Sequence, residues 1–212
     1  REFITSAQWR FAQTEHERQM FVHYFGCSKK EIYILPLPIE VQHISRIKKR
    51  REKTMVFVGR LHTLKGVSRL IQWSLPLLKT DTELKFLIIG RDDGAEKSLR
   101  EQVPAWAKNQ ILFLGGVYGD ALKRIYATSA CFVFSPAYPE ETSTAALEAL
   151  ACGLPVITNH NAEIPHLTEY KAGVYAETRQ EFTQAIEKFL KKNKTQDIYK
   201  HCRAVIRDHF ES

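Results

Sequence analysis

Long hydrophobic runs are absent from this sequence of 212 residues. It contains no run of 18 apolar residues, so it predicts no transmembrane helix. Its first residues lack the apolar core and the small-residue cleavage site of a signal peptide. Because the chain begins with Arg1 rather than methionine, we expect it to be a fragment of a longer protein.

Cysteine is scarce, and it occurs in no metal-binding or redox pattern. The four cysteines are Cys27, Cys131, Cys152 and Cys202. They form no C-x-x-C pair and no ligand spacing with histidine, so we expect neither a metal site nor a cofactor. Cys131 opens an apolar run and Cys152 ends an apolar helix, which predicts that both are buried. A reducing cytoplasmic compartment fits this usage.

Several nucleotide-binding motifs are also missing. There is no G-x-G-x-x-G and no G-x-x-x-x-G-K-[ST], and the loop at 90–94 lacks the dinucleotide spacing. These absences argue against NAD binding and against P-loop nucleotide hydrolysis. No zinc-finger, helix-turn-helix or RNA-recognition signature occurs, so we expect no nucleic-acid partner.

The charge that is present is unevenly distributed. Lys and Arg number 31 against 24 Asp and Glu, a net charge of +7, and residues 45–53 alone hold six basic residues and one acid. One interpretation is contact with an anionic membrane surface at the inner face of the plasma membrane. The other is an exposed linker without a partner, which is the commoner meaning of a charge run.

From Thr54 onward, apolar strands alternate with helical patterns. The predicted strands are 54–59, 83–90, 110–116, 131–135, 155–158 and 172–176; the predicted helices are 64–79, 94–107, 120–129, 143–152, 163–169, 179–192 and 195–210. Continuous Val, Ile, Leu and Phe runs indicate parallel strands buried on both faces. The sequence therefore predicts an α/β fold with a doubly wound, Rossmann-like parallel sheet, which binds ligands at the carboxyl ends of its strands.

The part before Thr54 is less regular. Residues 3–5 resemble a strand, a helical pattern ends at Gly26, and 30–39 is an apolar strand closed by two prolines. The basic run follows it.

The most informative stretch is PEETSTAALEALACGLPVI, residues 139–157. Glu140 lies in a loop and Glu148, eight positions on, lies inside the predicted helix. Three hydroxyl residues at the helix start offer N-cap oxygens: Thr142, Ser143 and Thr144. Free N–H groups and the helix dipole at such a start favour a phosphate. We therefore expect a diphosphate here, flanked by carboxylates that can accept hydrogen bonds from sugar hydroxyls.

A second candidate is the loop after the first strand of the sheet, GRLHTLKG, residues 59–66. Arg60 and Lys65 could clamp phosphate oxygens, through a guanidinium fork and a point charge respectively. Taken alone, the two cations could equally be ordinary surface charge. For His62, in the same loop, we favour exposure to solvent over contact with phosphate.

Both stretches resemble motifs of one family. Residues 140–157 resemble the E-x7-E motif of retaining glycosyltransferases of the GT-B fold, family 4, which continues E-A-x-A-x-G-x-P-V-I. The loop 59–66 is similar to the G-R-x-x-x-x-K-G signature of that family, and 114–118 to its F-x-G-x-V segment. The sequence departs from the family after Glu140, where Gly-Phe-Gly is common, and at 162–166, where Gly-Gly-x-P-E is common.

The resemblance implies the C-terminal, donor-binding half of a GT-B glycosyltransferase. Residues 1–37 would be the tail of the N-terminal domain and the crossing, 38–53 a basic linker, 54–195 the nucleotide-sugar domain and 196–212 a C-terminal helix. The partners implied are a UDP- or GDP-sugar and the missing N-terminal domain. The acceptor would be a polysaccharide or lipid-linked molecule of the cell envelope.

The resemblance also implies roles for single residues. Arg60 and Lys65 would hold the donor diphosphate without a metal, Glu140 would be catalytic at the sugar, and Glu148 would bind the ribose diol. The whole implied donor set is Gly59, Arg60, Lys65, Gly116, Val117, Glu140, Thr142, Ser143, Thr144, Ala145 and Glu148.

Three alternatives remain open. A glycoside hydrolase could use Glu140 and Glu148 as an acid and base pair, although it would have no diphosphate for the cationic loop to hold. A Rossmann-like domain could also serve as a non-enzymatic interaction module. A GT-B nucleotide-sugar epimerase would share this half of the fold.

Overall fold

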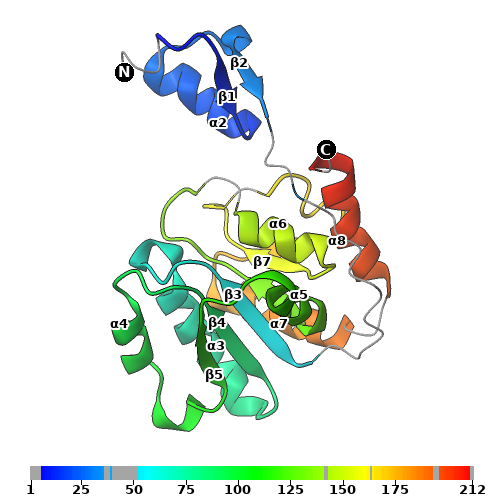
Figure 1. The fold of residues 1–212 in the computed structure, drawn as a ribbon. Coiled ribbons are helices and arrows are strands. Elements are labelled where there is room, and N and C mark those ends of the chain that lie inside the picture. Colours follow the sequence, from blue (N-terminus) through cyan, green and yellow to red (C-terminus); the bar gives the residue numbers. More distant parts are fainter. Residues whose placement is uncertain are drawn as a thin grey trace.

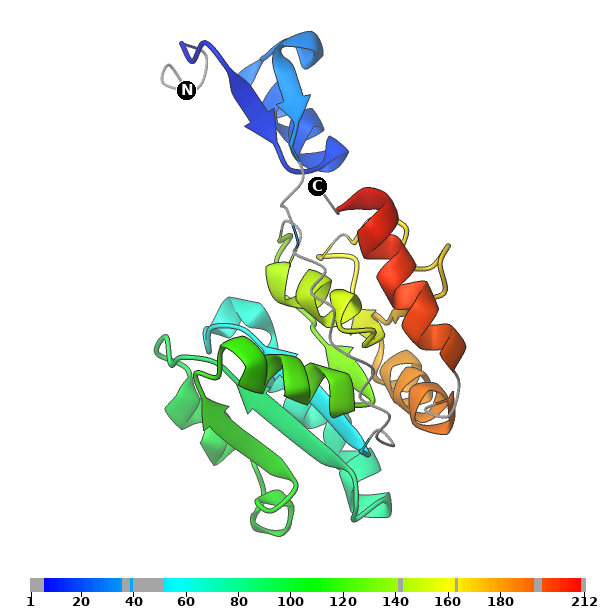
Figure 2. The ribbon, with the colours of Figure 1, turned by 45° about the vertical axis from the view of Figure 1, so that its right-hand side comes forward.

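The computed structural model describes residues 6–35, 39, 52–140, 143–162, 164–192 and 196–210. Two parts are visible in Figures 1 and 2: a small N-terminal unit and a larger sheet domain. The N-terminal unit stands apart from the sheet in both views.

The sheet domain is built on six parallel strands. They are β3 (Thr54–Val58), β4 (Lys85–Ile89), β5 (Ile111–Gly115), β6 (Cys131–Val133), β7 (Val156–Thr158) and β8 (Gly173–Tyr175). Their order across the sheet is β5-β4-β3-β6-β7-β8, and all five neighbouring pairs are parallel. The chain thus winds outward from β3 in one direction and then from β6 in the other, which confirms the predicted doubly wound sheet.

Helices cover both faces of this sheet (Figures 1 and 2). They are α3 (Val67–Thr80), α4 (Glu96–Glu101), α5 (Gly119–Thr128), α6 (Thr144–Ala151), α7 (Arg179–Lys192) and α8 (Gln196–His209). Helix α3 contacts α7 on one face, whereas α6 contacts α5 and α8 on the other. A sheet covered on both sides requires strands that are apolar throughout, as their sequences are.

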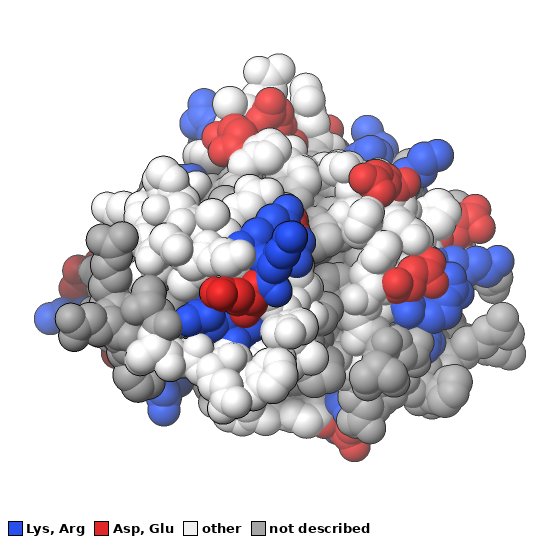
Figure 3. Space-filling model, turned by 90° about the horizontal axis from the view of Figure 1, so that it is seen from above, with Lys and Arg blue, Asp and Glu red and all other residues white. Residues whose placement is uncertain are grey.

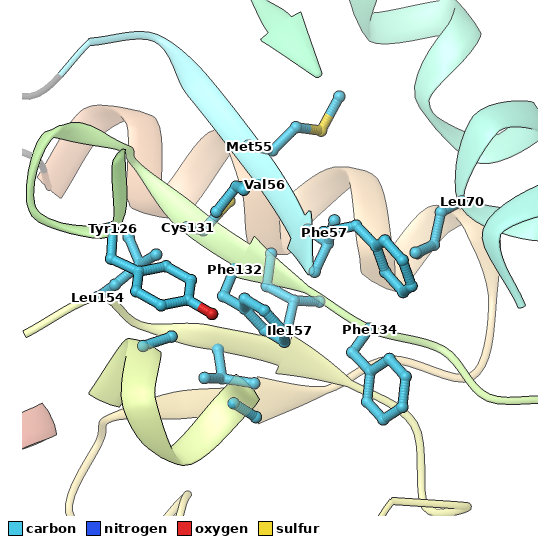
Figure 4. Packing of buried hydrophobic residues seen from close by; sticks show 14 of the residues in the cluster. Met55, Val56, Phe57, Leu70, Tyr126, Cys131, Phe132, Phe134, Leu154 and Ile157 are labelled. Atoms are coloured by element: carbon cyan, nitrogen blue, oxygen red, sulfur yellow. The ribbon is translucent and has the colours of Figure 1, made fainter. Parts of the chain in front are cut away.

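The centre of the sheet is its most buried region. Met55, Val56 and Phe57 of β3 and Phe132 of β6 have no exposed surface. Figure 4 shows these side chains with Tyr126, whose ring meets that of Phe132 edge-on at 6.2 Å between centroids. Burial of this much aromatic and aliphatic surface is the main stabilising term of the domain.

The N-terminal unit has a much smaller core. It consists of β1 (Arg10–Ala12), α2 (Glu15–Met20), a π-helical turn η1 (Phe21–Phe25) and β2 (Ile32–Ile34), with β1 parallel to β2. Its buried apolar cluster contains three residues: Ala12, Cys27 and Ile32. Four aromatic side chains of the same unit are half or more exposed: Trp9, Phe11, Tyr24 and Tyr33.

Some expectations about single elements were wrong. The helix expected at 94–107 is limited to α4, because Pro104 has no N–H and interrupts the helix before a separate 3-10 turn at Ala105–Ala107. No helix forms in the described part of 163–169, where His166 has a φ of 61°, a left-handed conformation that a right-handed helix cannot contain. The strand β1 was not predicted. The strand expected at 3–5 and most of the basic linker lie outside the described residues.

The described helices include none long and apolar enough to cross a membrane. Figure 3 shows one face of the molecule, on which Lys and Arg side chains lie beside Asp and Glu. Of the basic run at 45–53, only Glu52 and Lys53 are described, and Lys53 pairs with Asp81 and Glu83 at 2.9 Å each.

Candidate functional site: a charged cavity at the carboxyl edge of the sheet

Three loops meet where the strand order reverses between β3 and β6. The loop after β3 is bonded to the loop after β4, because the Leu61 N–H donates to the Arg91 carbonyl at 2.9 Å. It is also bonded to the loop after β6, because the Ala137 N–H donates to the Leu64 carbonyl at 2.8 Å. In a doubly wound sheet, this reversal is where ligands bind.

Gly66 allows the first and third of these loops to touch. Its φ is 71°, in the left-handed region that glycine adopts most readily. A Cβ atom at this position would lie 1.7 Å from the carbonyl oxygen of Ser135. Any larger residue would therefore push the two loops apart.

The three loops enclose a cavity of about 360 Å³. Its lining consists of Arg60, His62, Leu64, Lys65, Asp93, Tyr138, Pro139 and Glu140. Two cations and two carboxylates thus face one space, with exposed apolar side chains of Leu64 and Tyr138 at its border.

Each cation of the cavity is paired with a carboxylate. Arg60 Nη1 lies 2.8 Å from Asp93 Oδ2, and Lys65 Nζ is hydrogen-bonded to Glu140 Oε1. The Arg60 side chain is 61% exposed and the Lys65 side chain 20% exposed, so the lysine pair is the better shielded from water. A more shielded pair experiences a lower effective dielectric constant, which strengthens its attraction.

Glu140 is held on two sides. Its backbone N–H donates to the Asn161 carbonyl at 2.6 Å, which ties the loop after β6 to the loop after β7. Its carboxylate meets Lys65, a residue 75 positions earlier in the chain. The ammonium of Lys65 lies 5.9 Å from the centre of the Phe134 ring, within cation–π range.

Helix α6 begins next to this loop. Ser143 is its N-cap, and the hydroxyl accepts a hydrogen bond from the Ala146 N–H at 3.4 Å. Thr144 is exposed at the first helical position. Thr142 lies outside the described residues, so its expected role at the helix start is a prediction still.

Glu148 stands on α6 and does not line the cavity. The residue as a whole is exposed, but its neighbours partly desolvate the carboxylate, and this burial raises the pKa of Glu148 above its ordinary value. Lys123 on α5 opposes the rise. Burial raises the pKa of the Cys152 thiol to about 12, and burial together with the charge of Glu148 raises the pKa of Tyr126.

The cavity contains some of the predicted donor-binding residues but not all. Arg60, Lys65 and Glu140 come together there. The other described members of the predicted set do not line it: Gly59, Gly116, Val117, Ser143, Thr144, Ala145 and Glu148. Gly116 lies beyond β5 under the side chain of Tyr118, whose hydroxyl would be 2.8 Å from a Cβ atom there.

Sequence reasoning missed Asp93 and Tyr138 and favoured an exposed His62. His62 is half-buried and lines the cavity, so the expectation that it lies free in solvent was wrong. Asp93 could have been found, because it follows β4 at the same edge as Arg60. Among the described residues, no cluster of three or more His, Cys, Asp or Glu side chains could hold a metal ion.

The comparisons with known proteins all point to glycosyltransferases. A family profile described as "Glycosyl transferases group 1" matches residues 39–204. An uncharacterized glycosyltransferase of Methanocaldococcus jannaschii is 35% identical over 108 residues, which are 51% of this chain and 27% of that protein. A D-inositol 3-phosphate glycosyltransferase of Rhodococcus jostii is 32% identical over 114 residues, 50% of this chain and 25% of that protein.

A solved structure shares the fold over nearly the whole chain. The crystal structure of HepE from Anabaena in complex with UDP superposes with a TM-score of 0.79 at 16% identity, over 98% of this chain and 61% of that one. The fold expected from the sequence is thereby confirmed. The matched region spans about a quarter of the length of the two curated relatives.

Proposed function

The chain belongs to the glycosyl transferases group 1 family, and we propose that it is the donor-binding part of an enzyme that transfers a sugar from a nucleoside-diphosphate sugar. The observation that carries this proposal is the meeting of Arg60, Lys65 and Glu140 in one cavity at the strand-order reversal. A hydrolase has no need of two cations at this position, and a pure interaction module has no need of a charged cavity.

The diphosphate would exchange places with the carboxylates that now pair with the cations. Arg60 would turn from Asp93, and Lys65 from Glu140, toward phosphate oxygens, which are strong acceptors for both side chains. After this exchange the two cations would stabilise negative charge on the leaving group. The proposed transfer needs no metal, since protein cations do the work of a divalent ion.

Glu140, once released from Lys65, would hydrogen-bond the sugar and act as the catalytic carboxylate of a retaining transfer. Glu148 would accept hydrogen bonds from the ribose diol, for which its partly desolvated carboxylate is suited. Ser143, Thr144 and Ala145 would present the α6 N-terminus to phosphate. Gly116 and Val117 would border the base.

The N-terminal unit would be the end of a preceding domain. Its three-residue cluster is too small to fold alone, and Trp9 (60% exposed), Phe11 (53%) and Tyr33 (50%) present apolar surface. The proposal is that further chain before residue 1 covers this surface and binds the acceptor, a polysaccharide or lipid-linked molecule. It includes a cytoplasmic location, with the basic run at 45–53 in contact with anionic lipid.

Calorimetric titration tests the donor site. The chain is titrated with UDP, GDP, ADP and CMP without metal, beginning with UDP because the Anabaena structure holds it. We expect saturable binding of one diphosphate, weakened about tenfold or more in Lys65→Ala, the loss expected for one charge-assisted contact.

Lys188→Ala is the matched control, because Lys188 is an exposed lysine of α7 outside the cavity. It should bind as the parent chain does. Equal loss in both variants would point to general charge attraction and would contradict a specific site. If no nucleotide binds to the chain, the donor-binding proposal for these residues fails.

A further inference from the structure

His62 lies between the two cations of the charged cavity in the sequence and lines the cavity with them. It follows Arg60 by two residues, precedes Lys65 by three, and lines the same space as both. The residue is half-buried, with φ −117° and ψ 149°, and it caps the 3-10 turn Thr63–Lys65. Its backbone is fixed on both sides, because the His62 N–H donates to the Arg60 carbonyl at 2.9 Å and the Lys65 N–H donates to the His62 carbonyl at 3.0 Å.

A backbone hydrogen bond determines which nitrogen of the neutral His62 ring carries the proton. The Leu64 N–H donates to His62 Nδ1 at 3.2 Å. A ring nitrogen that accepts a hydrogen bond carries no proton, so in the neutral ring the proton must be on Nε2. The cap therefore makes Nε2 a hydrogen-bond donor.

His62 Nε2 differs from the two cations in having no hydrogen-bond partner among the described residues. Arg60 is paired with Asp93 and Lys65 with Glu140, whereas no described residue accepts a hydrogen bond from His62 Nε2. An incoming anion would have to displace a carboxylate from each cation, but no described residue from the histidine.

We propose that His62 is a third ligand of the donor diphosphate, and that it donates the Nε2 proton to a phosphate oxygen while its Nδ1 caps the loop. This inference rests on the proposed function of the cavity. It assigns His62 a binding role that depends on its tautomer rather than on a positive charge. The backbone cap and the ligand contact use opposite nitrogens of one ring, so two substitutions can separate them.

His62→Asn preserves the cap and removes the donor from the position of Nε2. The Asn Oδ1 atom can accept from the Leu64 N–H as Nδ1 does, and asparagine is a preferred capping residue, but no atom reaches the position of Nε2. We expect an unchanged melting temperature and UDP affinity lower by about fivefold to tenfold. This is the upper part of the range for an ordinary hydrogen bond, because water at this partly exposed site weakens the bond to the charged phosphate.

His62→Gln does the reverse. Its longer amide can place an N–H donor near the position of Nε2, while the acceptor at Nδ1 is lost. We expect a lower melting temperature and UDP affinity within about threefold of the parent chain. If His62→Asn binds UDP as tightly as the parent, His62 is only a loop cap and the inference is overturned.

A spectroscopic measurement tests the tautomer directly. Nitrogen-15 NMR of the imidazole ring should show the Nδ1 resonance of an unprotonated nitrogen and the Nε2 resonance of a protonated one, with Nε2 shifted when UDP is added. A proton on Nδ1, or no change at Nε2 under saturating UDP, would contradict the inference. UDP binding that is lost in Lys65→Ala but unaffected in His62→Asn would leave the donor site standing and remove His62 from it.

Discussion

The interior of the sheet and its carboxyl edge are built in opposite ways. At the centre, Met55, Val56, Phe57 and Phe132 are completely buried and apolar, and no described Asp, Glu, Lys or Arg is buried anywhere in the chain. At the edge, in the loops after β3, β4 and β6, two ion pairs line a cavity, and the left-handed Gly66 follows one of the cations directly in the chain.

The two regions contribute to different properties: the interior to stability and the edge to binding. Apolar burial in the interior contributes free energy that requires no partner. The edge contains groups that contribute little to stability by themselves, such as the exposed Arg60–Asp93 ion pair. Such features persist because the interior over-determines the fold, and they are then available for a ligand.

The largest expected effect comes from the interior. Phe132→Ala should lower the free energy of unfolding by about 3–5 kcal/mol, because it leaves a cavity between β6 and Tyr126 of α5. For a domain of this size, that corresponds to a fall in melting temperature of roughly 6–20 °C, measured by thermal unfolding.

Nucleotide affinity measured well below the melting temperature should remain within about twofold of the parent chain, because Phe132 lines no part of the cavity. A large loss of affinity in the folded variant would show that the interior and the edge are coupled. That result would contradict the conclusion that the interior provides stability and the edge provides binding independently.

Glycine substitutions at the edge should have the next largest effect. Gly66 and Gly94 both have positive φ, 71° and 86°, but only Gly66 has a neighbour where a Cβ would be, since nothing lies within 4 Å at Gly94. Gly94→Ala should cost about 1–2 kcal/mol through backbone strain alone. Gly66→Ala should cost about 2–5 kcal/mol, because overlap with the Ser135 carbonyl adds to that strain.

The binding measurement gives the sharper test. Displacement of the loop after β3 should weaken UDP binding in Gly66→Ala much more than in Gly94→Ala. Similar affinities in the two variants would mean that the contact between the Gly66 and Ser135 loops does not shape the cavity.

The interior was largely predictable from the sequence, and physical reasons explain where prediction stopped. Strands β3 and β4 follow from uninterrupted apolar runs that end in glycine, and the alternation with helices implies a parallel sheet. β1 was missed because Arg10–Ala12 has three residues, too few to show an apolar run or an alternation. No helix forms in the described part of 163–169 because His166 has a left-handed backbone conformation, which the composition does not reveal.

The edge was predictable only in part. That Arg60 and Glu140 lie at one edge follows from the strands that precede them, because carboxyl ends of parallel strands share that edge. The ion-pair partners of these side chains cannot be predicted in the same way, because the Arg60–Asp93 pair depends on how the loop after β4 folds. The acceptor role of His62 Nδ1 depends on a backbone N–H direction that no sequence pattern encodes.

The smallest expected effect is at Glu148, and it has opposite signs for stability and binding. Its pKa is raised in the folded chain, so the folded state holds its proton more tightly than the unfolded state does. The associated stability is present below the ordinary pKa of 4.5 and is lost as the pH rises through the raised value. At pH 7 the ionised carboxylate therefore costs stability, although solvent screening keeps the cost below about 1 kcal/mol.

Glu148→Gln should accordingly raise the melting temperature at pH 7 by no more than about 2–4 °C, and the gain should vanish near pH 4. Under the proposed function it should also weaken UDP binding, because a neutral amide accepts a hydrogen bond from a ribose hydroxyl less strongly than a carboxylate. A variant that is more stable and binds UDP more weakly would show that Glu148, like the residues of the edge, serves ligand binding rather than stability. A variant that is less stable at pH 7 would instead show that the charge of Glu148 stabilises the fold, as the residues of the interior do.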